Sequence, residues 1–348
     1  MCEGIIITNE AKKHLTNNDA IPLSLFEYPT TSGISLVLPD NIYVNAQFSG
    51  KYARSPIILD YKNDYFLNFN NEITPVKIIP LPDYFNKKDT DGNLYTNFIM
   101  SHTDRMRINP IWGCYFTCKY CDFNKERYKK IPFVKLKEAI DVALADKNIQ
   151  PKHLLISGGT PKPEDRDFLD SIYEQVTKYL LQKNITTDIM LAPRKEKDLL
   201  KKLKSWGVNS LSINLEIYQE ELAKKFNPEK AKISREFYFQ FIKDAVMIFG
   251  ISKVRSILII GLEPISETLK GVEEIAKLGS DIVLSPFMSS ENIALAHIKP
   301  PTEQDLIEVY EKSKIITDKY GVTIGPRCIP CQHNTLAFPN NSSEYFFS

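Results

Sequence analysis

The chain has 348 residues, and its 44 Lys and Arg residues nearly balance 43 Asp and Glu residues, giving a formal net charge of +1. Since 43% of the residues are apolar and 25% are charged, the composition is typical of a soluble globular protein. Nucleic-acid and membrane surfaces usually require clustered basic residues, which the balanced charge does not suggest. We therefore expect neither nucleic acid nor a membrane as a partner.

The apolar segments and the first residues bear on where the protein is found. No run of about 18 apolar residues occurs, so the sequence predicts no transmembrane helix. Residues 1–11 lack the basic stretch and long apolar run of a secretory signal. We therefore expect a cytoplasmic protein, in which the six cysteines are metal ligands or reactive thiols rather than disulfides.

The first third of the chain is rich in short segments of β-branched and aromatic residues. Breaks such as Pro-Asp, Ser-Gly and Asn-Asn-Glu separate these segments, which is typical of a small antiparallel β unit. The expected strands are 34–38, 42–46, 56–59, 65–69 and 76–79. Residues 82–100 carry Pro, Asn, Asp and Gly and are interpreted as a linker. Residues 1–100 are thus expected to form a small β-rich N-terminal domain with its linker.

From residue 106 onward, strands and helices are expected to alternate. The predicted strands are 107–113, 153–158, 187–192, 210–217, 254–262, 281–287 and a short 322–325. Apolar residues at helical spacing predict a helix over 164–183, and a capping box predicts another over 302–320. Short returns from helix to strand indicate a parallel sheet with helices outside.

The predicted fold class is therefore α/β: a partial (β/α)6 TIM-type barrel preceded by the small N-terminal β domain. We assign residues 101–300 to the barrel, and residues 301–348 to a C-terminal helix and a CxxC tail that complete it. In such barrels the functional residues lie at the C-terminal ends of the strands.

Three cysteines follow the first predicted strand of the barrel, namely Cys114, Cys118 and Cys121. Three thiolates within eight residues can converge on one soft metal centre. A cubane iron–sulfur cluster normally takes four cysteines, so three would leave one iron open to an external ligand. The alternatives are a zinc site, which usually pairs two CxxC knuckles or adds histidines, and three buried thiols.

The CxxxCxxC spacing, with the aromatic Tyr120 before the last cysteine, resembles the radical S-adenosylmethionine superfamily. The resemblance covers residues 107 to about 290 and looks closest to the biotin-synthase-like branch. It implies a [4Fe-4S] cluster on the three cysteines, with S-adenosylmethionine bound to the open iron. It further implies hydrogen-atom abstraction from a small-molecule substrate, and an electron donor such as flavodoxin or ferredoxin.

Ser157, Gly158, Gly159 and Thr160 end the second predicted strand of the barrel. Two glycines at a strand end permit the backbone to approach a ligand closely, although an ordinary turn is the alternative. The resemblance implies that this segment contacts the methionyl ammonium of S-adenosylmethionine. The family motif has Glu where this sequence has Thr160, so a backbone carbonyl would have to serve.

Polar residues on two later strands are further candidates for cofactor binding. Alternation sends Ser212, Asn214 and Glu216 to one face of their strand. The resemblance implies that Asn214 and Glu216 contact the ribose and the ammonium, and that Ile260 lies in the adenine-contacting stretch. Arg255 is either a clamp for a carboxylate or one half of a salt bridge at the strand start.

A second cysteine pair, Cys328 and Cys331, follows the last short strand, with Arg327 and His333 nearby. We expect the pair at the functional end of the barrel and assign it a catalytic role. It could hold an auxiliary iron–sulfur cluster or metal, act as a redox dithiol, or simply be packed. Cys2 could supply a third thiol.

These features leave several functions open. With an auxiliary centre the reaction would be sulfur insertion or another cluster-assisted step. Without one it would be a rearrangement, lyase or epimerase reaction, and the pair would supply a hydrogen atom or merely bind metal. A non-enzymatic iron–sulfur or zinc-binding protein is the alternative from another class. His153, at the start of a predicted strand, is interpreted as structural.

Overall fold

The computed structural model describes residues 3–15, 25–27, 31–48, 55–121, 128–289 and 293–339. Within these residues, no helix is both long enough and apolar enough to cross a membrane.

The largest sheet has seven strands and a largely parallel topology. Its order is β17-β16-β15-β14-β13-β10-β9. All neighbouring strands in this order pair in parallel, except β10 and β9. The strands are β9 (Ile99–His102), β10 (Arg105–Ile108), β13 (His153–Ile156), β14 (Thr186–Met190), β15 (Ser210–Ser212), β16 (Val254–Ile260) and β17 (Asp281–Pro286). Six parallel strands in chain order confirm the expected α/β partial barrel.

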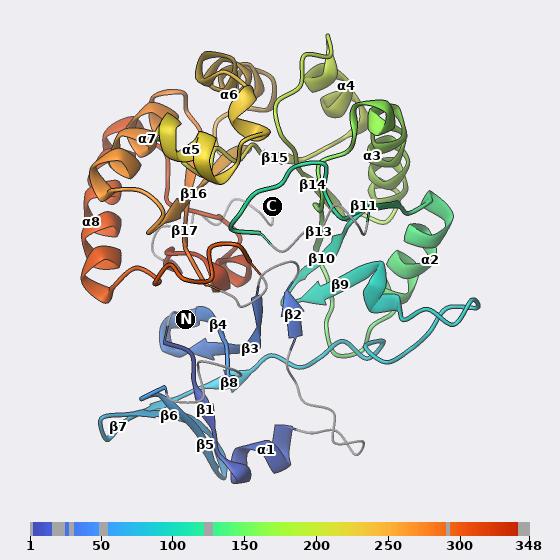
Figure 1. Ribbon diagram of the computed structural model, residues 1–348. Coiled ribbons are helices and arrows are strands. Elements are labelled where there is room, and N and C mark those ends of the chain that lie inside the picture. Colours follow the sequence, from blue (N-terminus) through green and yellow to red (C-terminus); the bar gives the residue numbers. More distant parts are fainter. Residues whose placement is uncertain are drawn as a thin grey trace.

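The helices of this part lie outside the strands (Figure 1). They are α2 (Phe133–Leu144), α3 (Arg166–Leu181), α4 (Leu199–Trp206), α5 (Glu220–Phe226), α6 (Arg235–Phe249), α7 (Ile265–Lys277) and α8 (Glu303–Tyr320). On α3, Ile172, Val176 and Leu180 are buried at the predicted spacing of four. The main core forms where such apolar faces pack against the sheet.

Two parts of the barrel differ from the sequence prediction. Strand β9 lies in the predicted linker and its junction, and pairs antiparallel with β10 at the edge of the sheet. The predicted strand 210–217 ends as β15 at Ser212, because the N–H of Leu215 donates to the side-chain hydroxyl of Ser256 in β16 instead of to a backbone carbonyl. Pairing with β16 resumes only as a single bridge between Glu216 and Leu258. Glu216 then takes a left-handed backbone conformation, with φ of 70°.

The N-terminal residues form two small sheets, in agreement with the expected β-rich unit, although the first strand pairs in parallel and not antiparallel. One sheet has the order β1-β5-β6-β7, and in the other β3 pairs with β2, β4 and β8. The elements are β1 (Ile6–Ile7), α1 (Asn9–Leu15), β2 (Leu25–Glu27), β3 (Thr31–Leu38), β4 (Ile42–Ala46), β5 (Ile58–Lys62), β6 (Asp64–Phe69), β7 (Glu72–Pro75) and β8 (Lys77–Ile78). A separate set of buried apolar side chains forms a core between β1, α1, β3, β4 and β5, with partly buried ones from β6 and β8 packed against it.

The C-terminal segment crosses the base of the barrel. Ile324 pairs in parallel with Ile282 of β17, so the predicted short strand is reduced to a single bridge. The Arg327 guanidinium donates to both carboxylate oxygens of Asp281, at 2.6 and 2.9 Å. The short 3-10 helix η7 (Ile329–Asn334) follows, and its His333 ring lies 4.3 Å from that of His102, at the end of β9. This segment therefore links the two edges of the open sheet.

Candidate active site

The three-cysteine loop lies at the C-terminal edge of the parallel strands. It follows β11 (Ile111–Trp112), a short strand that pairs with β12 (Lys129–Lys130) just beyond β10. Cys114, Cys118 and Cys121 form no disulfide and together line a cavity of about 390 Å³ in the barrel. The strand order thus brings them to the end where such barrels hold their reacting groups.

The Cys114 sulfur accepts two backbone hydrogen bonds. The donors are the N–H of Phe116, at 3.3 Å, and the N–H of Thr160, at 3.2 Å. Burial raises the pKa of the Cys114 thiol, and it raises the pKa of Cys118 to about 12. Bound iron would hold these sulfurs as thiolates, and N–H donors of this kind stabilise cluster thiolates. The loop therefore fits a cluster held by three cysteines.

The glycine pair after β13 packs against this loop. A Cβ atom on Gly159 would lie 1.6 Å from the carbonyl oxygen of Gly113, so only glycine fits. The N–H of Tyr115 donates to the Thr160 carbonyl at 2.9 Å, which ties the two segments together. Ser157, Gly158, Gly159 and Thr160 also line the cavity. The close approach expected of Gly159 is thus made to the cysteine loop itself.

Tyr120 joins a buried polar network beside the cysteines. Its hydroxyl contacts the Glu216 carboxylate and accepts a hydrogen bond from Asn227 Nδ2 at 3.0 Å. Lys230 Nζ lies 2.9 Å from Glu216 Oε2. Burial opposes the charge of Lys230, but attraction to Glu216 raises its pKa above the usual value. A cation and an anion are thereby held at the cavity wall.

Lys230 and Asn227 were missed in the sequence. They lie between α5 and α6, around the 3-10 helix η6 (Lys230–Lys232), where no motif marks them. A buried lysine requires a partner such as Glu216, because burying its charge is costly. This signal could not be used, since the sequence of a short helix does not show that Lys230 is buried.

Asn214 also faces the cavity. Ser212, Asn214 and Glu216 all line it, whereas Ile213 and Leu215 are buried in the main core, which agrees with the predicted alternation. The Ser212 hydroxyl donates to Asn214 Oδ1 at 2.7 Å, and Tyr238 donates to the Asn214 backbone carbonyl. The first bond fixes the Asn214 side-chain amide and the second fixes its backbone. The side-chain nitrogen of Asn214 takes no part in either bond.

Arg255 and Ile260 lie at opposite ends of β16. Arg255, near the strand start, donates to Ser210 at 3.1 Å and lies 3.9 Å from Asp188. Of the two alternatives for Arg255, these contacts favour the salt bridge at the strand start over the carboxylate clamp. Ile257 and Ile259 line the cavity, whereas Ile260 is buried in the main core. Strict alternation from Arg255 would have indicated this, because odd-numbered residues share its face.

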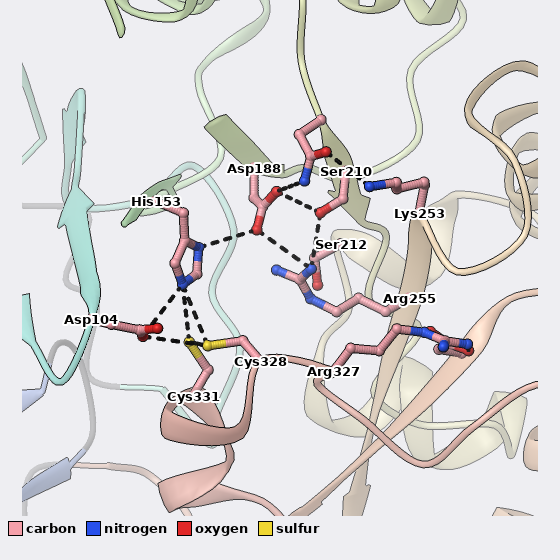
Figure 2. Close-up of polar contacts among 12 residues, drawn as sticks. Asp104, His153, Asp188, Ser210, Ser212, Lys253, Arg255, Arg327, Cys328 and Cys331 are labelled. Atoms are coloured by element: carbon pink, nitrogen blue, oxygen red, sulfur yellow. Dashed lines mark hydrogen bonds and ion pairs between the residues drawn. The ribbon is translucent and has the colours of Figure 1, made fainter. Parts of the chain in front are cut away.

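The second cysteine pair lies at the other end of the barrel from the one expected. Figure 2 shows Cys328 and Cys331 next to Asp104, which precedes β10, and His153, the first residue of β13. Both partners stand at the N-terminal ends of their strands. The prediction went wrong because the chain turns back at Arg327, toward the start of β17, instead of continuing past the strand end.

The four side chains converge in a buried position. Their ligand atoms all lie within 4.8 Å of one another, and each residue is at most 9% exposed. His153 therefore belongs to a cluster of possible metal ligands, whereas its position at a strand start had suggested only a structural role. Cys2 lies outside the described residues, so the structure does not bear on its proposed part.

Electrostatics within the pair are asymmetric. Burial raises the pKa of the Cys331 thiol, but the hydrogen bond from Cys328 and the charges of Arg105 and His153 outweigh burial and lower it well below its usual range. The hydrogen bond to Cys331 and burial raise the pKa of Cys328. The environment thus favours a thiolate at Cys331.

Both cysteine groups open onto the same cavity, one at each end. A second cavity of about 470 Å³ adjoins it and shares Ser157, Gly158, Gly159 and Thr160 as a wall. Both volumes are in the range usual for small-molecule sites. Fold and site together define a class of protein: a partial α/β barrel that presents a three-cysteine metal centre to an internal small-molecule site.

Comparison with known proteins gives the family. The model of the radical SAM superfamily matches residues 108–282, half of the chain. The chain belongs to the radical SAM superfamily.

Two curated proteins are similar in sequence. The bacteriochlorophyllide c C-7(1)-hydroxylase of Chlorobaculum limnaeum is 26% identical over 226 residues, which is 59% of this chain and 56% of that protein. The heme chaperone HemW of Bacillus subtilis (strain 168) is 27% identical over 120 residues, 32% of each chain. The chain therefore spans less than two thirds of either relative.

Among solved structures, the FeFe-hydrogenase maturase HydG from Carboxydothermus hydrogenoformans is similar, with a TM-score of 0.52 and 17% identity. The match covers 67% of this chain and 56% of that one. This likeness shows the fold alone. Nothing in these matches singles out the biotin-synthase-like branch, which stays a prediction.

Proposed function

We propose that the protein is a radical SAM enzyme that acts on a small molecule bound inside the barrel. The observation that carries this proposal is the single cavity lined by Cys114, Cys118 and Cys121 together with Tyr120 and Glu216. When bound, a [4Fe-4S] cluster and S-adenosylmethionine supply reductive cleavage to a 5′-deoxyadenosyl radical, which abstracts a hydrogen atom from the substrate.

The protein's own groups would bind and orient the cosubstrate. Glu216 would accept from the ammonium or the ribose, with Lys230 and Tyr120 fixing its carboxylate in place. Asn214 would donate from its amide nitrogen, and the backbone around Thr160 would supply a carbonyl. The end of β16, at Ile259 and Ile260, would offer apolar and backbone contact to the adenine.

The rest of the cavity would hold the substrate. Its walls between the two cysteine groups include Arg107, Leu155, Ile257 and Val283, which combine apolar surface with one cation. Enclosure in the barrel would keep water from a reactive intermediate. Arg255 is assigned to this inner region, since it pairs with Asp188 at the strand starts.

We propose that Cys328 and Cys331 hold an auxiliary metal centre at the inner end of the cavity. Their convergence with His153 and Asp104 supports this over a packed thiol pair. The second candidate is a rearrangement, lyase or epimerase reaction with no auxiliary centre. A cytoplasmic location and a flavodoxin or ferredoxin donor complete the proposal.

The test distinguishes a reaction with the auxiliary centre from one without it by measuring two products: 5′-deoxyadenosine, which forms early, and the product of the substrate, which forms late. With Cys328→Ser and Cys331→Ser, 5′-deoxyadenosine should still form while product from the substrate is lost. Unchanged product would contradict a role for the pair. The control is Cys118→Ser, which should abolish both. If the reconstituted wild-type protein forms no 5′-deoxyadenosine, the proposed function fails as a whole.

A further inference from the structure

We propose that Asp104, His153, Cys328 and Cys331 bind one divalent cation of the zinc class, which ties the C-terminal segment to the barrel base. The site is mononuclear and has four protein ligands, so it is no second iron–sulfur cluster. The inference stands on the geometry of these residues and goes beyond the proposed reaction.

Four of the distances between donor atoms match a single coordination sphere. Bonds of about 2.0–2.3 Å from one tetrahedral ion place its donor atoms about 3.3–3.8 Å apart. His153 Nε2 lies 3.5 Å from Cys328 Sγ, 3.4 Å from Cys331 Sγ and 3.7 Å from Asp104 Oδ1. Cys328 Sγ lies 3.4 Å from Asp104 Oδ1. The two sulfurs, 2.7 Å apart, need to separate by about 1 Å.

The second nitrogen of His153 faces a buried carboxylate, which is the arrangement found behind histidine ligands of metals. Nδ1 lies 3.5 Å from Asp188 Oδ2, and Asp188 accepts a hydrogen bond from Ser210 at 2.7 Å (Figure 2). Asn209 donates to the same carboxylate at 3.1 Å. A carboxylate behind a histidine ligand fixes the ring so that Nε2 points at the metal. Asp188 is 3% exposed, so its orientation is firmly set.

The ligand chemistry selects the metal. Two thiolates, one imidazole and one carboxylate suit zinc in a closed tetrahedral site. Clusters distribute thiolate ligands over several irons, whereas these four donors meet at one point. A mononuclear zinc site carries no bridging sulfide, so a site of this kind is no sulfur source.

The position of the site gives its role. Cys328 is separated from His153 by 175 residues and from Asp104 by 224. Arg327, its neighbour, is fixed to Asp281 at the start of β17. An ion here therefore joins β10 and β13 to the segment that starts at β17, and it closes the base of the open barrel.

The experiment removes the first cluster so that the remaining metal reports on the base site. A variant with Cys114→Ser, Cys118→Ser and Cys121→Ser is purified from zinc-supplemented cells without reconstitution. Zinc, iron and acid-labile sulfide are then measured per chain. We expect about one zinc ion and no sulfide. Iron with sulfide, or metal-free protein with either free thiols or a Cys328–Cys331 disulfide, would overturn the proposal.

Substitutions in this background assign the ligands. His153→Ala and Cys331→Ser should lose most of the zinc, and His297→Ala, at an exposed histidine, should retain it. Asp104→Asn keeps the side-chain volume and should lose zinc several-fold faster to a chelator, which covers the case that His153→Ala fails to fold. Zinc retained by all ligand variants would refute the assignment. The readout involves no cosubstrate cleavage, so a negative result would remove the metal from this site and leave the proposed cleavage at the three-cysteine loop untouched.

Discussion

At the scale of single residues, the site depends on charges that are buried next to their partners. Glu216 and Lys230 form such a pair, with side-chain exposures of 18% and 10%. Because Tyr120 contacts the same carboxylate from the cysteine loop, the pair connects the cluster loop to the wall of the cavity.

Removing the lysine should destabilise the fold. Lys230→Met leaves the Glu216 carboxylate without its cation, and breaking a buried pair costs about 3 kcal/mol or more. The measurement is urea unfolding of the apoprotein. Lys224→Met is the control, since Lys224 pairs with Glu221 on the exposed surface and should cost less than about 1 kcal/mol. Equal losses for both variants would refute a special role for Lys230.

Glu216→Gln should weaken cosubstrate binding without affecting the cluster. Losing a charged hydrogen bond of about 1.5–3 kcal/mol should raise the S-adenosylmethionine concentration for half-maximal 5′-deoxyadenosine formation about 10- to 100-fold. Iron content should equal that of the wild type. Glu221→Gln serves as the matched control. An unchanged half-maximal concentration in Glu216→Gln would remove this carboxylate from the binding site.

At the scale of elements, the cysteine loop takes its shape from the turn after β13. Gly159 allows the two backbones to touch, and the Thr160 N–H donates to the Cys114 sulfur. The turn after one strand thus positions the metal ligands that follow another.

Gly159→Ala should therefore prevent cluster assembly. The added methyl group would meet the Gly113 backbone, which cannot yield as a flexible side chain could. Iron and sulfide after reconstitution should fall to a small fraction of the wild-type value. Gly321→Ala, at the end of α8, is the control, because its Cβ would meet nothing within 4 Å and adds only backbone strain at φ of 69°. A full cluster in Gly159→Ala would contradict the packing argument.

Much of the arrangement of strands and of the cysteine loop could be predicted from sequence. Alternation along residues 212–216 correctly separates cavity from core, and the spacing of Cys114, Cys118 and Cys121 indicates the metal centre directly. By contrast, nothing local marks Lys230 or His153, since their partners lie far away in the chain. The short strand β15 was overextended because a side chain, Ser256, captures a backbone N–H, which no pattern reveals.

At the scale of the whole molecule, the C-terminal segment holds the partial barrel together. It connects β17, through Arg327, with β10 and β13, through the cysteine pair, and its His333 ring lies beside His102. The sequence predicted that this tail completes the barrel, but it placed the tail at the wrong end, because the direction in which a chain turns after a strand depends on tertiary contacts.

Arg327→Ala should loosen this closure. Its guanidinium pairs with the buried Asp281, so the variant should lose several kcal/mol of stability and show faster amide hydrogen exchange over residues 322–335. Lys319→Ala, at an exposed surface pair, is the control. Unchanged exchange in Arg327→Ala would show that the salt bridge does not anchor the segment.

The three-cysteine loop is proposed to carry a cluster that cleaves S-adenosylmethionine in this barrel. The most direct measurement is 5′-deoxyadenosine formed by anaerobically reconstituted protein with dithionite and S-adenosylmethionine, compared with Cys118→Ser. We predict its formation by the wild type and none by the variant. Absence of 5′-deoxyadenosine from a wild-type protein with its full cluster would contradict the claim.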